Sequence, residues 1–125
     1  MIVLDASALL AFLFREVGQE RVAEVVERSC LSAVNLCEVL GRFARDRHDP
    51  VEVLSRIRET SIEIVPFDAG QAVLAAALAP VLRPRGLSLG DRACLALAVS
   101  RGVPALTADR AWIDLDIGVE VRVIR

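Results

Sequence analysis

Short apolar strands alternate with helices along this chain, and the alternation limits its fold more than any other feature of its 125 residues. Runs of β-branched and aliphatic residues predict strands at 2–5, 62–65, 104–106 and 119–124, and a brief strand at 30–32. Helical patterning fills the intervals, at 6–14, 18–28, 33–46, 50–59, 69–80 and 90–101, with a helical turn near 109–113. Such alternation builds parallel crossover units. We therefore predict an α/β fold, a three-layer α/β/α sandwich with a short, mainly parallel central sheet.

The length and composition favour a single domain over residues 1–125. Mean hydropathy is +0.49, so either the core is rich in Ala, Val and Leu, or a partner covers apolar surface. The longest apolar stretch, at 72–82, is too short to cross a bilayer. There is no basic segment before the apolar N-terminus, and the three cysteines form no C-x-x-C pair. We expect a cytoplasmic protein without membrane contact, its cysteines acting as small core residues.

The acid at position 5 stands directly after the apolar run Ile2, Val3 and Leu4. A lone buried carboxylate is costly, so Asp5 is expected to be neutral, paired with a cation or bound to a metal ion. Ligand sites of open α/β sheets lie at the carboxyl ends of strands, where Asp5 is predicted to lie. Asp109 follows the strand at 104–106 and shares this edge.

Helix capping explains several of the other acids. Asp49 and Asp68 each precede a helix and need no other role. Asp91, in Ser88-Leu89-Gly90-Asp91, and Asp109, behind Thr107, also fit as caps. Glu38 does not, because it lies inside the helix at 33–46 among apolar residues.

If the strand ends bring Asp5, Glu38, Asp91 and Asp109 together, their charges need a counterion. Two carboxylates about 4 Å apart repel by roughly 4 kcal/mol at an effective dielectric constant near 20. The chain has no lysine to neutralise them. Oxygen ligands without histidine or thiolate suit Mg²⁺ or Mn²⁺ better than zinc.

All 15 basic residues are arginine, in a chain of formal net charge -2. A codon bias explains the absence of lysine, but arginine clusters also match phosphate geometry. Candidate contacts to RNA are Arg42, Arg45, Arg83, Arg85 and Arg92. The low density of basic residues predicts modest, salt-sensitive binding of nucleic acid. The single histidine, His48, leaves little room for a hydrolytic triad or a zinc site, and we expect it to be solvated.

Four segments, VLDASALLA, SAVNLCEV, SLGDRACLALA and LTADRAW, resemble in their order and spacing the PIN-domain ribonucleases, above all the VapC toxins of bacterial toxin–antitoxin pairs. The resemblance covers the whole chain. It implies an acidic pocket that holds one or two Mg²⁺ or Mn²⁺ ions and cleaves RNA by metal-activated water. It places Asp5, Glu38, Asp91 and Asp109 on the four acidic positions, with Ser7, Asn35 and Thr107 holding the carboxylates. Asp114 and Asp116 fall outside this set.

The resemblance further implies a homodimer, a cognate antitoxin whose tail covers the active-site groove, and a structured RNA substrate such as tRNA or ribosomal RNA. Three other interpretations stay open at this point. The chain could be an RNA-processing nuclease of the same kind without a toxin role, or a binding module whose acids hold a cation or a basic segment without turnover. A phosphoacceptor receiver also gathers acids at strand ends, but the lack of lysine disfavours it.

Overall fold

A five-stranded sheet forms the centre of the computed structural model, which describes residues 1–125. The strands are β1 (Ile2–Leu4), β2 (Ser29–Ser32), β3 (Glu63–Val65), β4 (Ala105–Thr107) and β5 (Val121–Val123). Their order is β3-β2-β1-β4-β5, and every neighbouring pair is parallel. The predicted sheet was mainly parallel; the observed sheet is wholly so.

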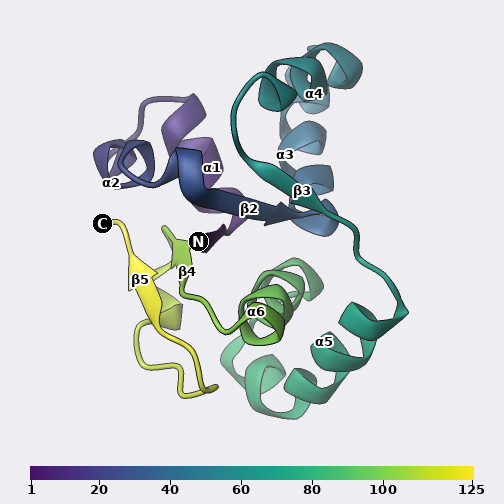
Figure 1. Ribbon diagram of the computed structural model, residues 1–125, viewed down its shortest axis with the longest axis vertical. Coiled ribbons are helices and arrows are strands. Elements are labelled where there is room, and N and C mark those ends of the chain that lie inside the picture. The colour runs from purple at the N-terminus through teal and green to yellow at the C-terminus, as the bar shows by residue number, and fades with distance from the viewer.

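Helices cover both faces of this sheet, which gives the expected three layers (Figure 1). On one face lie α1 (Ala6–Leu13), α2 (Gln19–Ala23), α3 (Ala33–Arg45) and α4 (Pro50–Arg58), and on the other lie α5 (Ala69–Leu82) and α6 (Leu89–Arg101). Three short 3-10 helices, η1 (Val26–Arg28), η2 (Arg83–Arg85) and η3 (Arg110–Trp112), complete the chain. None of the helices is both long and apolar enough to cross a bilayer.

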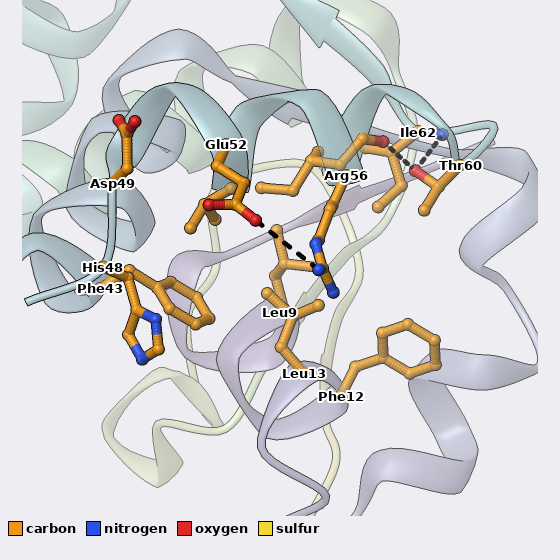
Figure 2. Close-up of a pocket in the computed structure, with 12 residues that line it drawn as sticks. Leu9, Phe12, Leu13, Phe43, His48, Asp49, Glu52, Arg56, Thr60 and Ile62 are labelled. Carbon is orange, nitrogen blue, oxygen red and sulfur yellow. Dashed lines mark hydrogen bonds and ion pairs between the residues drawn. The ribbon is translucent and has the colours of Figure 1, made fainter. Parts of the chain in front are cut away.

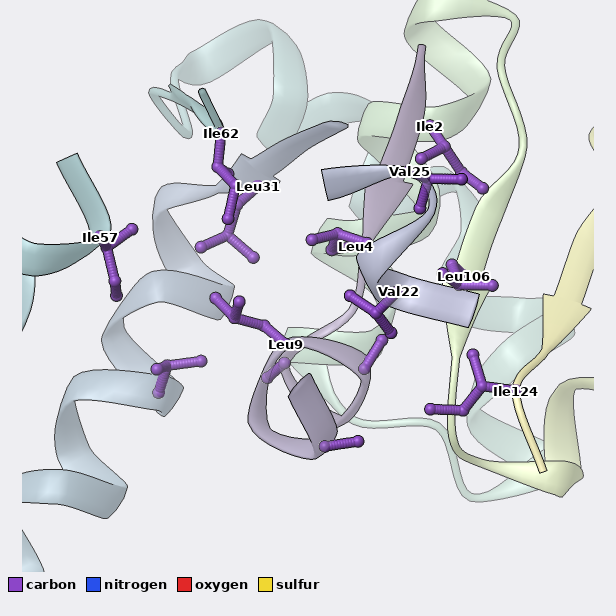
Figure 3. Close-up of a cluster of buried hydrophobic side chains, with 14 residues drawn as sticks. Ile2, Leu4, Leu9, Val22, Val25, Leu31, Ile57, Ile62, Leu106 and Ile124 are labelled. Atoms are coloured by element: carbon purple, nitrogen blue, oxygen red, sulfur yellow. The ribbon is translucent and has the colours of Figure 1, made fainter. Parts of the chain in front are cut away.

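The apolar core is divided between the two faces. One cluster joins β1 and β2 to the first four helices, through side chains such as Leu4, Leu9 and Leu31, which are fully buried (Figure 3). The other cluster packs α5 and α6 against the opposite face and includes Trp112 of η3. The 3-10 helix η3, which carries Trp112, packs on β5.

Polar side chains fix where the helices begin. Asp49 accepts a hydrogen bond from the backbone N–H of Val51, and Asp68 accepts one from that of Gln71. Both acids are therefore helix caps, as predicted. Ser32 caps α3 in the same way, so α3 starts directly at the end of β2.

Two expectations fail in detail. The helix expected at 18–28 is two short pieces, because the backbone N–H groups of Val25 and Arg28 bond to carbonyls three residues back, the 3-10 pattern. This tighter turn buries both Val22 and Val25. Cys30 and Cys94 are buried, but Cys37 is exposed on α3 and is not a core residue.

The topology determines which residues meet at the carboxyl edge of the sheet. β1 is the central strand, so Asp5, which follows it, lies between the ends of β2 and β4. α3 leaves the end of β2, so its first turns stay at this edge. α6 runs back toward the start of β4, which brings its N-terminus to the same edge. The parallel order thus carries Asp91 to the side on which Asp5 lies.

Candidate metal centre

Asp5 is the centre of the site, and two hydroxyl groups hold its side chain. The residue is 4 % exposed. Ser7 Oγ donates a hydrogen bond of 2.6 Å to Asp5 Oδ2, and Thr107 Oγ1 donates one of 2.9 Å to the same oxygen. Asp5 occupies the N-cap position of α1 but accepts no capping bond with its side chain. Its carboxylate is therefore bonded to Ser7 and Thr107 and not to the start of the helix.

The same hydroxyl groups connect the ends of β1 and β4. Ser7 Oγ accepts from the backbone N–H of Ala108, and Thr107 Oγ1 accepts from that of Asp109, each at 3.0 Å. Each hydroxyl thus accepts a hydrogen bond from a backbone N–H and donates one to Asp5. Because Thr107 is fully buried and its oxygen is anchored on both sides, the carboxylate has little freedom to turn.

Burial raises the pKa of Asp5 to about 6. Loss of hydration is the largest cause, the hydrogen bonds from Ser7 and Thr107 oppose it, and the negative charges of Asp91 and Glu38 add to it. Arginine is not among these causes. The ionised form of Asp5 is thus electrostatically destabilised at neutral pH, and a bound cation would stabilise it.

Glu38 reaches this site from the second turn of α3. The amide of Asn35, one turn earlier, donates from Nδ2 to Glu38 Oε1 at 2.9 Å and also to the backbone carbonyl of Gly90 at 2.9 Å. Asn35 is fully buried, and its Oδ1 has no hydrogen-bond partner. Asn35 therefore ties Glu38 to the start of α6.

Asp91 and Asp109 both cap helices and border the site. Asp91 Oδ2 accepts from the backbone N–H of Ser88 at 2.9 Å, while Ser88 Oγ accepts from that of Asp91, a complete capping box. Asp109 Oδ1 accepts from the backbone N–H of Ala111 at 2.9 Å and so starts η3. In each cap only one carboxylate oxygen is bonded, so capping and metal binding do not compete for the same atom.

The structure brings two of the other three acids into electrostatic range of Asp5. Asp91 and Glu38 both act on Asp5, whereas Asp109 is connected to Asp5 through Thr107 and is itself exposed. The structure contains no group of three or more His, Cys, Asp or Glu side chains arranged to hold a metal ion. The acids that act on Asp5, Glu38 and Asp91, nevertheless offer carboxylate oxygens only, the donor type that suits Mg²⁺ or Mn²⁺.

The arginines predicted to contact RNA are spread over three places. Arg92 follows Asp91 and donates from Nε to the carbonyl of Ser88 at 3.4 Å, so it is the one nearest the acids in sequence. Arg85 donates to the carbonyl of Ala111, and Arg83 lies on the same short helix. Arg42 pairs with Asp46 at 3.5 Å and lies over the ring of Phe14, and Arg45 ends α3.

An apolar groove of about 370 Å³ lies between α1, α3 and α4 (Figure 2). Its floor and walls include Leu9, Phe12, Leu13, Phe43 and Val53. His48 stands at its rim, edge-on to Phe43 with 5.7 Å between the ring centroids, and Glu52 pairs with Arg56 at 3.7 Å along α4. The groove carries no carboxylate of the site, so it is a separate surface.

The PIN domain profile matches residues 2–118, and the chain belongs to this family. Solved structures agree with the fold. The DNA-bound VapBC complex from Salmonella typhimurium is 19 % identical, with 99 % of this chain and 98 % of that chain covered and a TM-score of 0.73. A toxin–antitoxin complex from Klebsiella pneumoniae is 16 % identical, with 95 % of both chains covered and a TM-score of 0.73. FitAcB from Neisseria gonorrhoeae is 24 % identical, with 96 % of both covered and a TM-score of 0.67. No curated protein matches the sequence.

The raised pKa of Asp5 predicts a stability that depends on pH. The folded chain holds the Asp5 proton up to about pH 6, whereas the unfolded chain releases it near its ordinary pKa of 3.8. The free energy of unfolding therefore falls as pH rises from about 4 to 6, by about 3 kcal/mol from this group, and stays lower above pH 6.

In EDTA, Asp5→Asn should be more stable than the natural protein at pH 8, and the difference should shrink toward pH 4.5. Urea melts measure it, with Asp68→Asn as the charge control; an Asp5→Asn protein that is equally destabilised at both pH values would refute the assignment.

The capping box of Asp91 predicts that two substitutions differ. Asn at position 91 still offers an oxygen to the Ser88 N–H and removes a charge that acts on Asp5, so Asp91→Asn in EDTA should be neutral or stabilising. Asp91→Ala loses the cap and should be less stable than Asp91→Asn by about 1 kcal/mol. Thermal melts of both variants test this, and a marked drop in Tm for Asp91→Asn contradicts it.

Proposed function

We propose that this chain is a Mg²⁺- or Mn²⁺-dependent endoribonuclease and the toxin of a toxin–antitoxin pair. The observation that carries the proposal is the buried Asp5 carboxylate at the end of the central strand, held by Ser7 and Thr107 and flanked by Glu38 and Asp91. The PIN family match and the fold shared with toxin–antitoxin structures support it.

Each side chain has a defined task in this proposal. Asp5, Glu38, Asp91 and Asp109 would hold the metal ion. A bound ion would supply activation of water for in-line attack on a phosphodiester and stabilisation of the charge on the phosphate. Ser7 and Thr107 orient Asp5 through their hydroxyl protons, and Asn35 orients Glu38 through its amide.

Binding of RNA would rely on few positive charges. Arg92 follows Asp91 in the chain, and Arg83 and Arg85 lie on η2, before the same helix α6. Because these contacts are local and the chain is acidic overall, we expect the affinity for RNA to fall with salt. The candidate substrates are structured RNAs, such as tRNA and ribosomal RNA, and mapping of the cleavage sites identifies which of them is cut.

Two protein partners are part of the proposal. The antitoxin is expected to cover the active-site groove with its tail, and we assign to the same partner the separate groove between α1, α3 and α4, where Leu9, Phe12 and Leu13 offer apolar surface to a helix. The helix α5 carries no charged residue over its 14 positions, and it exposes Val73 and Val81 by 68 % and 54 %. An uncharged, exposed helix favours burial against a second copy of the chain, as in a homodimer.

A cleavage assay tests the nuclease. The purified protein should cleave an RNA pool in Mg²⁺ or Mn²⁺ and not in EDTA, and Asp5→Asn should abolish cleavage while its circular dichroism spectrum stays unchanged. Asp68→Asn, an exposed cap on α5, serves as the matched control and should keep full activity. Cleavage by folded Asp5→Asn would overturn the assignment, and metal binding without any cleavage would favour a binding module.

A growth assay tests the antitoxin. Expression of the chain should arrest growth, and co-expression of the neighbouring gene product should relieve the arrest. Val53→Asp places a charge in the groove and should prevent the relief without lowering nuclease activity. Val51→Asp is the control, since Val51 lies on the same helix but is 72 % exposed and outside the groove. Equal relief for both variants would remove the groove from the proposal, and arrest without relief would favour an RNA-processing role.

A further inference from the structure

The side chain of Glu38 lies over the backbone of Gly90, in the first turn of α6. A Cβ atom added at position 90 would lie 2.5 Å from both Cδ and Oε1 of Glu38, a distance that real Cβ contacts essentially never show. Gly90 is buried, so the added atom could not avoid this contact by turning into solvent. The Glu38 carboxylate therefore occupies the space that any other residue at position 90 would fill.

Asn35 bonds to the same two groups. Its Nδ2 donates both to Glu38 Oε1 and to the carbonyl of Gly90. Turning the amide round would place Asn35 Oδ1 against these two acceptors, so only one orientation is possible. In that orientation Oδ1 is buried without a partner. The amide thus acts solely as a double donor between Glu38 and Gly90.

Neither feature serves the stability of the fold. The φ angle of Gly90 is not in the left-handed region, so the backbone does not require glycine there, and alanine is the better helix former. A buried acceptor without a donor is likewise unfavourable. Both costs fall on residues that contact Glu38, which indicates that they serve the position of that carboxylate.

We propose that Gly90 is a positioning residue. Its lack of a side chain and its carbonyl, which accepts a hydrogen bond from Asn35, hold the Glu38 carboxylate against α6, next to Asp91. This placement, called the seat of Glu38 below, sets the affinity for a divalent cation. The inference rests on the proposed function, because Glu38 is taken there as a metal ligand. Gly90 itself touches neither metal nor RNA in this scheme and acts only through Glu38.

Gly90→Ala in the full chain is the direct test. The atoms that the new methyl group meets are the end of a flexible side chain, so the fold should be kept while Glu38 moves aside. Manganese binding, followed by calorimetry or electron paramagnetic resonance, should weaken by about 10- to 100-fold. Gly41→Ala, on α3 with no atom within 4 Å of its added Cβ, is the matched control and should bind Mn²⁺ as the natural protein does.

A double-mutant cycle separates positioning from a general effect. In a Glu38→Ala background Gly90→Ala should cause no further loss of Mn²⁺ affinity, and an additive loss would overturn the inference. If Gly90→Ala alone fails to fold, the double variant must fold, because truncating Glu38 frees the space; an unfolded double variant would also overturn it.

A readout without metal separates this inference from the proposed function. The side-chain amide resonances of Asn35 should shift in Gly90→Ala as they do in Glu38→Ala and stay in place in Gly41→Ala. If the natural protein fails to bind Mn²⁺, the proposed function falls, and the Asn35 resonances alone then decide whether the seat exists. Natural Mn²⁺ affinity in folded Gly90→Ala, or unmoved Asn35 resonances, overturns the inference.

Discussion

The structure at the carboxyl edge depends on one buried anion, Asp5, and on the two hydroxyl groups that bond to it. A carboxylate removed from water loses several kcal/mol of hydration, and two hydrogen bonds recover only part of this. The raised pKa of Asp5 reflects the hydration free energy that these hydrogen bonds do not recover. Ser7 and Thr107 also accept hydrogen bonds from backbone N–H groups of the segment after β4. The same contacts therefore join the ends of β1 and β4. The fold is therefore built around a charge that the protein alone does not neutralise.

The acids around Asp5 combine structural and chemical tasks without conflict. Asp91 and Asp109 each give one oxygen to a helix start, which fixes the carboxylate and leaves the second oxygen unbonded within the protein. Glu38 caps nothing and is held by Asn35. Rigid caps stabilise the fold locally, while the repulsion that Asp91 and Glu38 exert on Asp5 opposes it. Such a balance is expected of a site whose stability is completed by a ligand.

Much of the fold could be predicted from the sequence, since the period of apolar residues places every strand and most helix starts within one or two residues. Asp49 and Asp68 are caps because a side-chain oxygen followed by the right residues leaves a local signature. The break after Ala23 was missed because it depends on burial of Val22 and Val25 against the sheet, a tertiary effect. The exposure of Cys37 has the same origin, because residue type alone does not tell which face of α3 is covered.

The candidate site was only partly predictable from the sequence, because some of its residues have a recognisable sequence context and others do not. Carboxylates at strand ends are visible because charge next to an apolar run needs an explanation, and Asp5 was found in this way. Gly90 gives no such sign, because a glycine in a first helical turn is compatible with many structures and acquires meaning only when a side chain from another helix is seen above it. Asn35 is intermediate, since its spacing from Glu38 is local but its bond to Gly90 is not. Space left empty for a neighbour is a property of two distant segments together, and only the folded chain reveals it.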